Sequence, residues 1–374
     1  MNHSTPLSAA TLDRLLAISD LTEAHALGRH AIEQQANAVC GAALAVMPGL
    51  RAVWKRGDRI ARAAHNYHLL GYAPEDVVLS GAHTQWVDGE RLLRTQTTSV
   101  VLEHLEQWKQ APVPSLVLAP GLVYRRDVRD RTHCGQPHQM DVWWLVPKEH
   151  EPIDPSAWLL GLMAQALPDV ETQALATSHP YTRAGIEVQA RWQAQWLEIG
   201  EGGLIDPALL ERLGINSSQW GGVASGWGLD RLVMVRKRLP DIRLLRDPLP
   251  AIARQMTHLD PWKEVSRQPT AVRELSLARP AGESEEALTE LLLATLPAGA
   301  EACLQAVEMA GLWPASALPA VALQRLGLQE DQENRLVRLV WQSPSRSIGR
   351  QEVNAWSRGL YRALHAGTAW AYCP

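Results

Sequence analysis

Apolar side chains at helical spacing mark the first part of the chain. Across residues 8–50 they recur at intervals of three and four residues, which predicts helices. From about residue 84 to residue 146 the pattern is that of short strands. Two apolar runs, 115–125 and 138–146, flank the charged stretch RDVRDRTHCGQP, so we expect a hairpin with a long, Arg-rich loop.

Further helices and strands are expected beyond this hairpin. Residues 155–167 and 206–213 have helical character, and residues 186–199 are typical of two short strands. Residues 228–238 predict an amphipathic helix, because apolar positions there recur at i, i+3 and i+4.

The composition of residues 250–269 is that of a linker, so we expect a domain boundary near residue 265. Beyond it, VRELSLA, the stretch Ala306–Gly311 and RLVRLVWQ predict strands, whereas ESEEALTELLLATLP and RQEVNAWSRGLYRALHAG predict helices. This order indicates a small ferredoxin-like α+β sandwich. The expected domains are therefore residues 1–265 and 270–374.

The composition excludes several classes of protein. The 374 residues are 46% apolar, carry a net charge of −4 and include four scattered cysteines. A disulfide framework, a structural zinc site and a generally basic nucleic-acid binder are therefore not expected. No stretch resembles a secretory signal or a membrane-spanning helix, so we expect a cytoplasmic protein.

Two features of the composition are unusual. Arginine supplies 31 of the 36 basic side chains, which reflects GC-rich coding or the use of arginine for binding phosphate. Phenylalanine is absent, while tryptophan occurs 15 times. We expect tryptophan to have taken over the large aromatic volume in the core.

The segment 121–141 groups side chains that can bind phosphate and an amino group. Arg125 ends a strand and can meet a phosphate with two N–H groups, and His133 can lie over a second phosphate. Gln139 and Asp141 lie two apart on the returning strand, so they share a face and suit an α-ammonium group. The alternative is a surface hairpin with solvated arginines.

A second segment, 221–247, is a glycine-rich strand that runs into a helix. Glycine lets a ligand approach the backbone closely, and Arg231 lies one turn into the helix. Its charge can meet a polyphosphate or stack on a base. The alternative is a tight strand-to-helix junction without a ligand.

Together these motifs resemble those of class II aminoacyl-tRNA synthetases, and in particular the phenylalanyl-tRNA synthetase family. YRRD…TH…HQMD and then GWGLDR are similar to the family's V-Y-R-x-D, T-H, F-H-Q-x-E and G-F-A-F-G-x-G-x-E-R. LLRTQTTS, SHPYTRAGIEV and WLEIGEGGLIDPALLERLGI resemble further family motifs, and the C-terminal part resembles the family's ferredoxin-fold anticodon-binding domain. The resemblance covers roughly residues 65–374.

The resemblance implies an α+β fold with an antiparallel class II sheet flanked by helices. It also implies activation of phenylalanine or a related amino acid with ATP and Mg²⁺, and transfer to tRNA. Carried over by motif, the ATP-binding residues are Arg125, His133, Glu187, Glu198 and Arg231. Of these, the two arginines would be catalytic, and Glu187 and Glu198 would hold the metal. The implied amino-acid-binding residues are Gln139, Asp141, His179, Tyr181, Ala224 and Ser225.

The departures from the family gather where the substrate side chain would lie. The family's residues are replaced at Gln96, Asp141, His179, Tyr181, Arg183, Val223 and Ser225. His179, Arg183 and Ser225 predict a pocket more polar than a phenyl ring needs, which favours a changed substrate. The alternative is that neighbouring side chains repacked in a chain without phenylalanine.

The end of the chain has a locally basic composition that predicts contact with tRNA. Between residues 335 and 362, Glu352 is the single acid. The six arginines of this stretch are Arg335, Arg338, Arg346, Arg350, Arg358 and Arg362. The bacterial family normally places the anticodon module on a second kind of subunit, whereas this chain resembles the organellar single-chain enzyme. We therefore expect a monomer or homodimer.

Two other functions stay open at this point. One is a paralogue that adenylates an amino acid for a non-tRNA acceptor in a biosynthetic pathway, and the other is a non-catalytic tRNA-binding regulator. The absent phenylalanine adds a hypothesis. An enzyme that loads phenylalanine tRNA with an analogue would itself be made intact from a gene without phenylalanine codons. Drift under GC-rich coding is the alternative.

Overall fold

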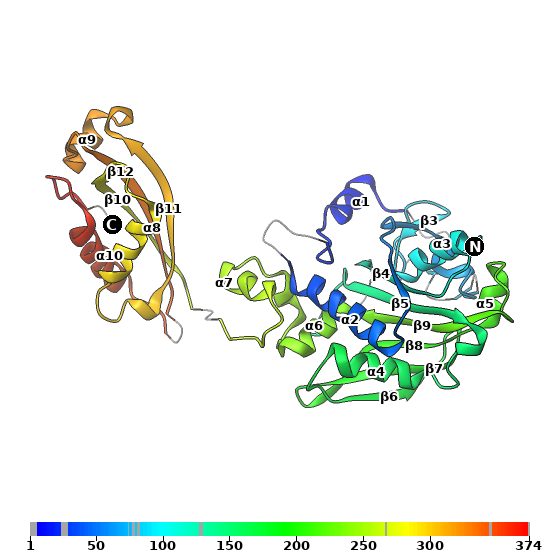
Figure 1. Cartoon of the computed structure of the whole chain (residues 1–374). Coiled ribbons are helices and arrows are strands. Elements are labelled where there is room, and N and C mark those ends of the chain that lie inside the picture. The colour runs from blue at the N-terminus through cyan, green and yellow to red at the C-terminus, as the bar shows by residue number, and fades with distance from the viewer. Residues whose placement is uncertain are drawn as a thin grey trace. The chain divides into compact units, whose positions relative to one another are not determined.

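The computed structural model describes residues 6–23, 29–73, 75–76, 79–80, 83–126, 130–265, 268–343 and 346–372. The chain divides into two compact units, Met1–Lys263 and Glu264–Pro374, close to the boundary expected near residue 265 (Figure 1). Each unit is described separately below.

The N-terminal unit is built on a seven-stranded sheet in the order β1-β4-β5-β9-β8-β7-β6. Only β1 and β4 pair in parallel; all other neighbours are antiparallel. The strands are β1 (Arg51–Trp54), β4 (Ser115–Leu122), β5 (His138–Pro147), β6 (Thr172–Ala176), β7 (Thr182–Trp192), β8 (Gln195–Ile205) and β9 (Trp220–Gly228). The mixed α+β fold with a mostly antiparallel sheet is therefore confirmed.

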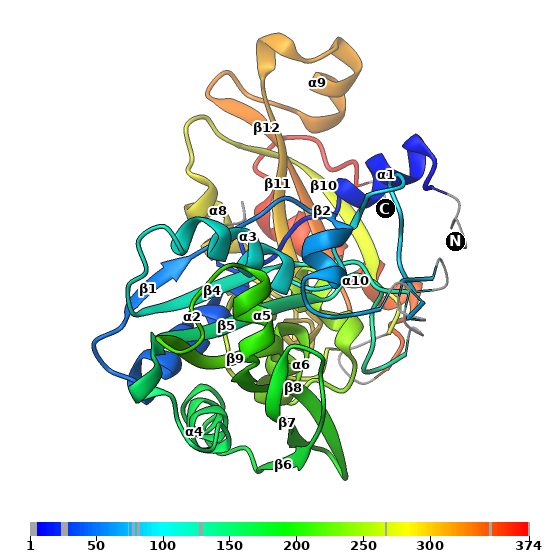
Figure 2. The same cartoon turned by 90° about the vertical axis from the view of Figure 1, so that its right-hand side faces the viewer.

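Helices cover both faces of this sheet (Figures 1 and 2). One face carries α2 (Ala31–Val46), α4 (Ser156–Ala166) and α6 (Leu229–Lys237). On the other face, α3 (Thr98–Trp108) and α5 (Pro207–Arg212) share a core cluster with the sheet.

Smaller elements complete the unit. They are α1 (Ala9–Leu16), a π-helical turn η1 (Ala64–His68), the strands β2 (Ile60–Arg62) and β3 (Arg91–Leu93), η3 (Lys148–His150), η4 (Ile242–Arg246), α7 (Pro250–Ala253) and η5 (Arg254–Thr257).

Adjacent tryptophans on β5 show how both faces of the sheet are filled. Successive side chains of a strand point to opposite faces. The Trp144 indole donates to the Ala43 carbonyl of α2, at 3.1 Å, whereas Trp143 packs in the cluster on the other side. Trp143, Trp144, Trp227 and Trp341 are the largest fully buried side chains among the described residues, so tryptophan does supply large aromatic volume to the core.

The C-terminal unit is a three-stranded antiparallel sheet in the order β10-β12-β11, with helices α8 and α10 on one face (Figure 1). Its elements are β10 (Ala271–Pro280), α8 (Glu285–Ala294), η6 (Glu301–Cys303), β11 (Leu304–Pro314), η7 (Ala315–Ala317), α9 (Ala320–Leu326), β12 (Gln332–Trp341) and α10 (Arg350–Leu364). Strand β12 lies between β10 and β11, which is the split β-α-β arrangement expected of a ferredoxin-like sandwich. The described residues after α10 form no further strand.

The structure corrects some of the expected elements. Residues 98–108 form a helix rather than part of a strand region. The region 250–269 is not simply a linker, because it contains α7 and η5 and buries Ile252 and Met256. The two strands expected within 186–199 are longer, and the helical region 8–50 is broken between Leu16 and Ala31.

Candidate active site

A cavity of about 820 Å³ opens on the sheet face that carries α3. Strands β5, β8 and β9, the loop after β4 and the start of α6 contribute to its wall. The cavity brings together eight of the residues expected from the sequence: Arg125, His133, Gln139, Asp141, His179, Tyr181, Glu198 and Arg231.

Strand register sets a row of side chains across the floor of this cavity. Asp141 of β5 lies opposite Gly226 of β9, and Gly226 lies opposite Glu201 of β8. Because residues in register share a face, the two carboxylates flank a glycine. A Cβ added to Gly226 would meet only Asp141 Oδ1, at 3.9 Å, so the floor between the carboxylates is hollow.

Asp141 is buried and already holds three protein donors. The hydroxyls of Thr97 and Thr98 donate to its two oxygens at 2.6 and 2.8 Å, and Trp143 Nε1 donates at 3.0 Å. Burial raises the pKa of Asp141 to about 6, and the charge of Glu201 adds to the rise, against the lowering effect of these hydrogen bonds. An ammonium group bound here would favour the ionised carboxylate.

Cationic side chains also line the cavity. Arg231 Nη1 donates to the Glu198 carbonyl at 2.8 Å, and its side chain lies 3.4 Å from the Glu198 carboxylate. His133 Nδ1 lies 2.9 Å from Asp130, and Arg125 is exposed on the cavity wall. These cationic side chains can therefore bind a polyanion.

His179 and Glu201 form an ion pair beside the hollow. His179 Nε2 lies 2.5 Å from Glu201 Oε2, and the two side chains are 22% and 31% exposed. The hydrogen bond with Glu201 raises the pKa of His179, although burial opposes this rise. A partly buried ion pair therefore lies where the family resemblance implies aromatic side chains lining the substrate pocket.

Three expected site residues do not line the cavity. Ser225 lies between two cavity-facing positions of β9, so it points to the opposite face, where its hydroxyl donates to the Val142 carbonyl at 2.8 Å. The prediction that Ser225 polarises the pocket is therefore wrong. Ala224 faces the cavity side but is buried in the core cluster. Glu187 is in register with Glu201 one strand further out, and its carboxylate accepts from Gln189.

The carboxylates do not form a cage for a metal ion. No group of three or more histidine, cysteine, aspartate or glutamate side chains in the described parts of the chain could hold one. Glu198 lies at the cavity mouth and is 47% exposed, so it could contact a magnesium ion that arrives with ATP. Glu187 does not reach the cavity, which leaves the expected Glu187–Glu198 pair unformed there.

A β-bulge explains why sequence reasoning missed Glu201. Opposite β7, the pairing passes from Gly200 to Glu198, so Ile199 is an extra residue in β8. In a regular strand, residues three apart point to opposite faces, but the bulge brings Glu198 and Glu201 to the same cavity. The two glutamates of WLEIGEGG, three residues apart, were the feature of the sequence that could have pointed to Glu201.

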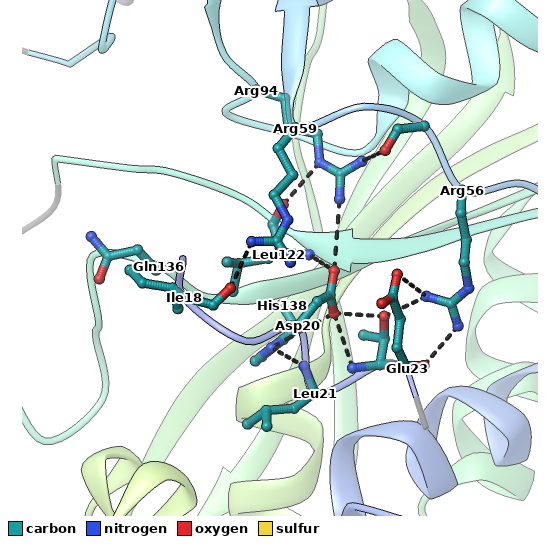
Figure 3. Close-up of polar contacts among 12 residues, drawn as sticks. Ile18, Asp20, Leu21, Glu23, Arg56, Arg59, Arg94, Leu122, Gln136 and His138 are labelled. Carbon is teal, nitrogen blue, oxygen red and sulfur yellow. Dashed lines mark hydrogen bonds and ion pairs between the residues drawn. The ribbon is translucent and has the colours of Figure 1, made fainter. Parts of the chain in front are cut away.

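A buried polar network fixes the start of β5 at the cavity edge (Figure 3). His138 is fully buried; its Nε2 accepts from the Leu21 N–H at 3.0 Å, and its Nδ1 donates to Asp230 at 3.1 Å. Asp20 accepts from the Leu122 N–H at 2.8 Å. The segment before α2 is thereby joined to β4 and β5. No motif or periodic pattern in the sequence pointed to Asp20.

Three of the six expected tRNA-binding arginines form ion pairs with carboxylates of the protein. Arg335 is buried and lies 2.7 Å from Glu333, so its inclusion in an exposed basic face is wrong. Arg338 lies between Glu274 and Glu308 on the sheet, and Arg346 pairs with Glu352. The exposed arginines of α10 are Arg350, Arg358 and Arg362.

The comparison with known families agrees with this geometry. The family model described as "tRNA synthetases class II core domain (F)" matches residues 29–256. The alpha subunit of phenylalanine–tRNA ligase from Prochlorococcus marinus (strain MIT 9312) is 33% identical over 195 residues, which are 52% of this chain and 55% of that protein. The alpha subunit from Synechocystis sp. is 30% identical over 242 residues, which are 64% of this chain and 69% of that protein.

The chain belongs to the class II tRNA synthetases, a family of ligases. Within that family it belongs with phenylalanine–tRNA ligase. It spans little more than half the length of several of the curated relatives it matches. Across the part of the chain that is described, no helix is long and apolar enough to cross a membrane.

Replacement of Asp20 by alanine is expected to destabilise the N-terminal unit. The Leu122 N–H would stay buried without its acceptor, which costs about 1–3 kcal/mol. Urea unfolding followed by tryptophan fluorescence should show the loss. Asp13→Ala, which removes an exposed carboxylate of α1, is the control. Equal unfolding curves for the two variants would contradict this role of Asp20.

Asp141 is expected to make stability depend on pH. Its pKa is about 6 in the folded protein and 3.8 in the unfolded reference, so the folded state binds the proton more tightly. Stability therefore falls as the pH rises from about 4 to about 6, by roughly 3 kcal/mol at full effect. The free energy of unfolding in urea should be measured between pH 4 and 7 for the wild type and for Asp141→Asn. The variant should lack this part of the dependence of stability on pH. A slope shared by wild type and variant would contradict the assignment.

Proposed function

We propose that this chain activates an amino acid with ATP as the aminoacyl-adenylate and transfers it to tRNA. The observation that carries the proposal is one cavity lined by Arg125, His133 and Arg231 together with Gln139 and Asp141. That arrangement suits a triphosphate next to an amino acid. The family membership and the names of the relatives support the same activity.

In the proposed reaction, a carboxylate oxygen of the amino acid attacks the α-phosphorus of ATP, and pyrophosphate leaves on the opposite side. Negative charge builds up on the phosphate oxygens, so the guanidinium groups of Arg125 and Arg231 stabilise the transition state. The backbone carbonyl of Glu198 holds Arg231 in place. Magnesium bound to ATP neutralises further phosphate charge, and Glu198 is the residue able to meet it.

The amino acid is proposed to be held through its ammonium group by Asp141 and Gln139. These side chains lie on β5 two residues apart and on the cavity side. The hydrogen bonds from Thr97, Thr98 and Trp143 fix the Asp141 carboxylate before substrate arrives. Such fixed positioning places the substrate carboxylate close to the α-phosphate.

The C-terminal unit is proposed to contact tRNA through α10. Arg350, Arg358 and Arg362 are exposed there, and Arg358 lies 6.0 Å from the centre of the Tyr372 ring. The relatives are named alpha subunits, whereas the proposal assigns the whole reaction to this chain, so the assays use the purified chain alone.

Replacement of Arg125 or Arg231 by alanine is expected to lower ATP–pyrophosphate exchange. Each variant loses a cation next to the reacting phosphates, so kcat/KM should fall on the order of 10²-fold or more. Arg14→Ala, which removes an exposed arginine of α1, should leave exchange unchanged. Near-normal exchange in either site variant would remove that arginine from the mechanism.

Joint replacement of Arg350, Arg358 and Arg362 by alanine should weaken tRNA binding by the full chain without changing pyrophosphate exchange. The dependence of the logarithm of affinity on the logarithm of salt concentration should become shallower by about 2. Anisotropy titrations with labelled tRNA between low and physiological salt measure this slope. Arg338→Ala is the comparison, because its guanidinium is already paired with Glu274 and Glu308. An unchanged slope in the triple variant would mean that α10 is only a solvated face.

A further inference from the structure

The two carboxylates that flank Gly226 differ in how much hydrogen-bonding capacity they have left. Asp141 is 2% exposed and takes three donors from the protein. Within the described residues, Glu201 has a single partner, His179, which lies against Oε2. Oε1 of Glu201 therefore stays available as an acceptor at the cavity wall.

The apolar space deeper in the fold, next to Gly226, is filled by the protein's own side chains. One step further along the strands, Trp143 lies opposite Ala224. Trp143 is fully buried, and its ring stacks on Tyr181 with centroids 6.4 Å apart and an interplanar angle of 4°. Ala224 is 1% exposed and does not line the cavity. A substrate side chain held above Gly226 is therefore directed toward Glu201 and His179 rather than over Ala224.

The wall in that direction is polar. Tyr72 and Gln96 line it together with the ion pair. Burial raises the pKa of Tyr72 to about 12, and Glu201 adds to the rise, so its hydroxyl keeps its proton at neutral pH. A hydrocarbon side chain would strip water from the charged pair without replacing the hydrogen bonds, which is unfavourable. A side chain with a donor would satisfy Glu201 Oε1 instead.

We propose that the amino acid substrate carries a hydroxyl or amino group on its side chain, which donates to Glu201, and that this chain prefers such an amino acid over phenylalanine. This inference rests on the proposed adenylation activity. It assigns Glu201 as the specificity-determining residue and His179 as the residue that positions it. Asp141 and Gln139 keep the α-ammonium group.

The test is ATP–pyrophosphate exchange by the full chain over a panel of amino acids. The panel holds the twenty standard amino acids and phenylalanines with a hydroxyl or amino group on the ring. We expect at least one amino acid with a side-chain donor to exceed phenylalanine in kcat/KM by about tenfold or more, because a site built for a donor rejects the analogue that lacks it. A preference for phenylalanine would overturn the inference and leave the proposed function intact. No exchange with any member of the panel would overturn the proposed function, and the inference with it.

The variant Glu201→Gln tests the assigned residue. It keeps the shape and removes the charge, so the ratio of kcat/KM for the donor-bearing amino acid to kcat/KM for phenylalanine should lose most of its excess over one. Glu171→Gln, an exposed carboxylate at the start of β6, is the matched control and should keep the preference. An equal loss for all amino acids in Glu201→Gln would mean that Glu201 holds the α-ammonium group, which would overturn the inference. Retention of the full preference would overturn it as well.

Discussion

The register of β5, β9 and β8 is the constraint on which the rest of the site depends. It fixes Asp141, Gly226 and Glu201 in one row and leaves a hollow between the two carboxylates. A slip of one residue in either pairing would turn a carboxylate to the opposite face, where α2, α4 and α6 pack. The core therefore holds the register, because Trp143 and Trp144 fill the two faces of β5.

Much of the fold could be predicted from the sequence because its elements have strong periods. Strands β4 and β5 are apolar runs bounded by polar loops, and α10 has clear amphipathic spacing. Helix α3 could not be recognised in this way. Its first turn contains Val100 and Val101, which favour strands, and both are buried by tertiary packing in the cluster with Trp143. The prediction of a linker over residues 250–269 was incomplete for a similar reason. Ile252 and Met256 are buried by tertiary packing, but they do not belong to a periodic apolar pattern.

The phosphate end of the site was easier to predict than the substrate end. Arg125, His133 and Arg231 belong to motifs, and each reaches the cavity. The substrate end depends on which face a residue occupies, and a motif does not show that directly. The prediction that Ser225 lines the pocket was wrong because the alternation of side chains along β9 turns Ser225 to the opposite face. Glu201 was missed because a bulge in β8 changes which residues of that strand face the cavity. The basic stretch at the end of the chain likewise showed its charge but not the pairing of Arg335, Arg338 and Arg346 with carboxylates.

The glycines of the sheet floor limit how this site can change during evolution. A Cβ at Gly200 would lie 2.4 Å from the Trp227 ring, and one at Gly202 would lie 2.6 Å from the Ala224 carbonyl, so neither position of β8 tolerates a side chain. Gly226 differs, since an added methyl group would meet only Asp141 Oδ1 at 3.9 Å. A single Gly226→Ala step would shrink the hollow without disturbing the backbone. New substrate ranges are therefore accessible at Gly226, while Gly200 and Gly202 stay fixed by the packing of β9 against β8.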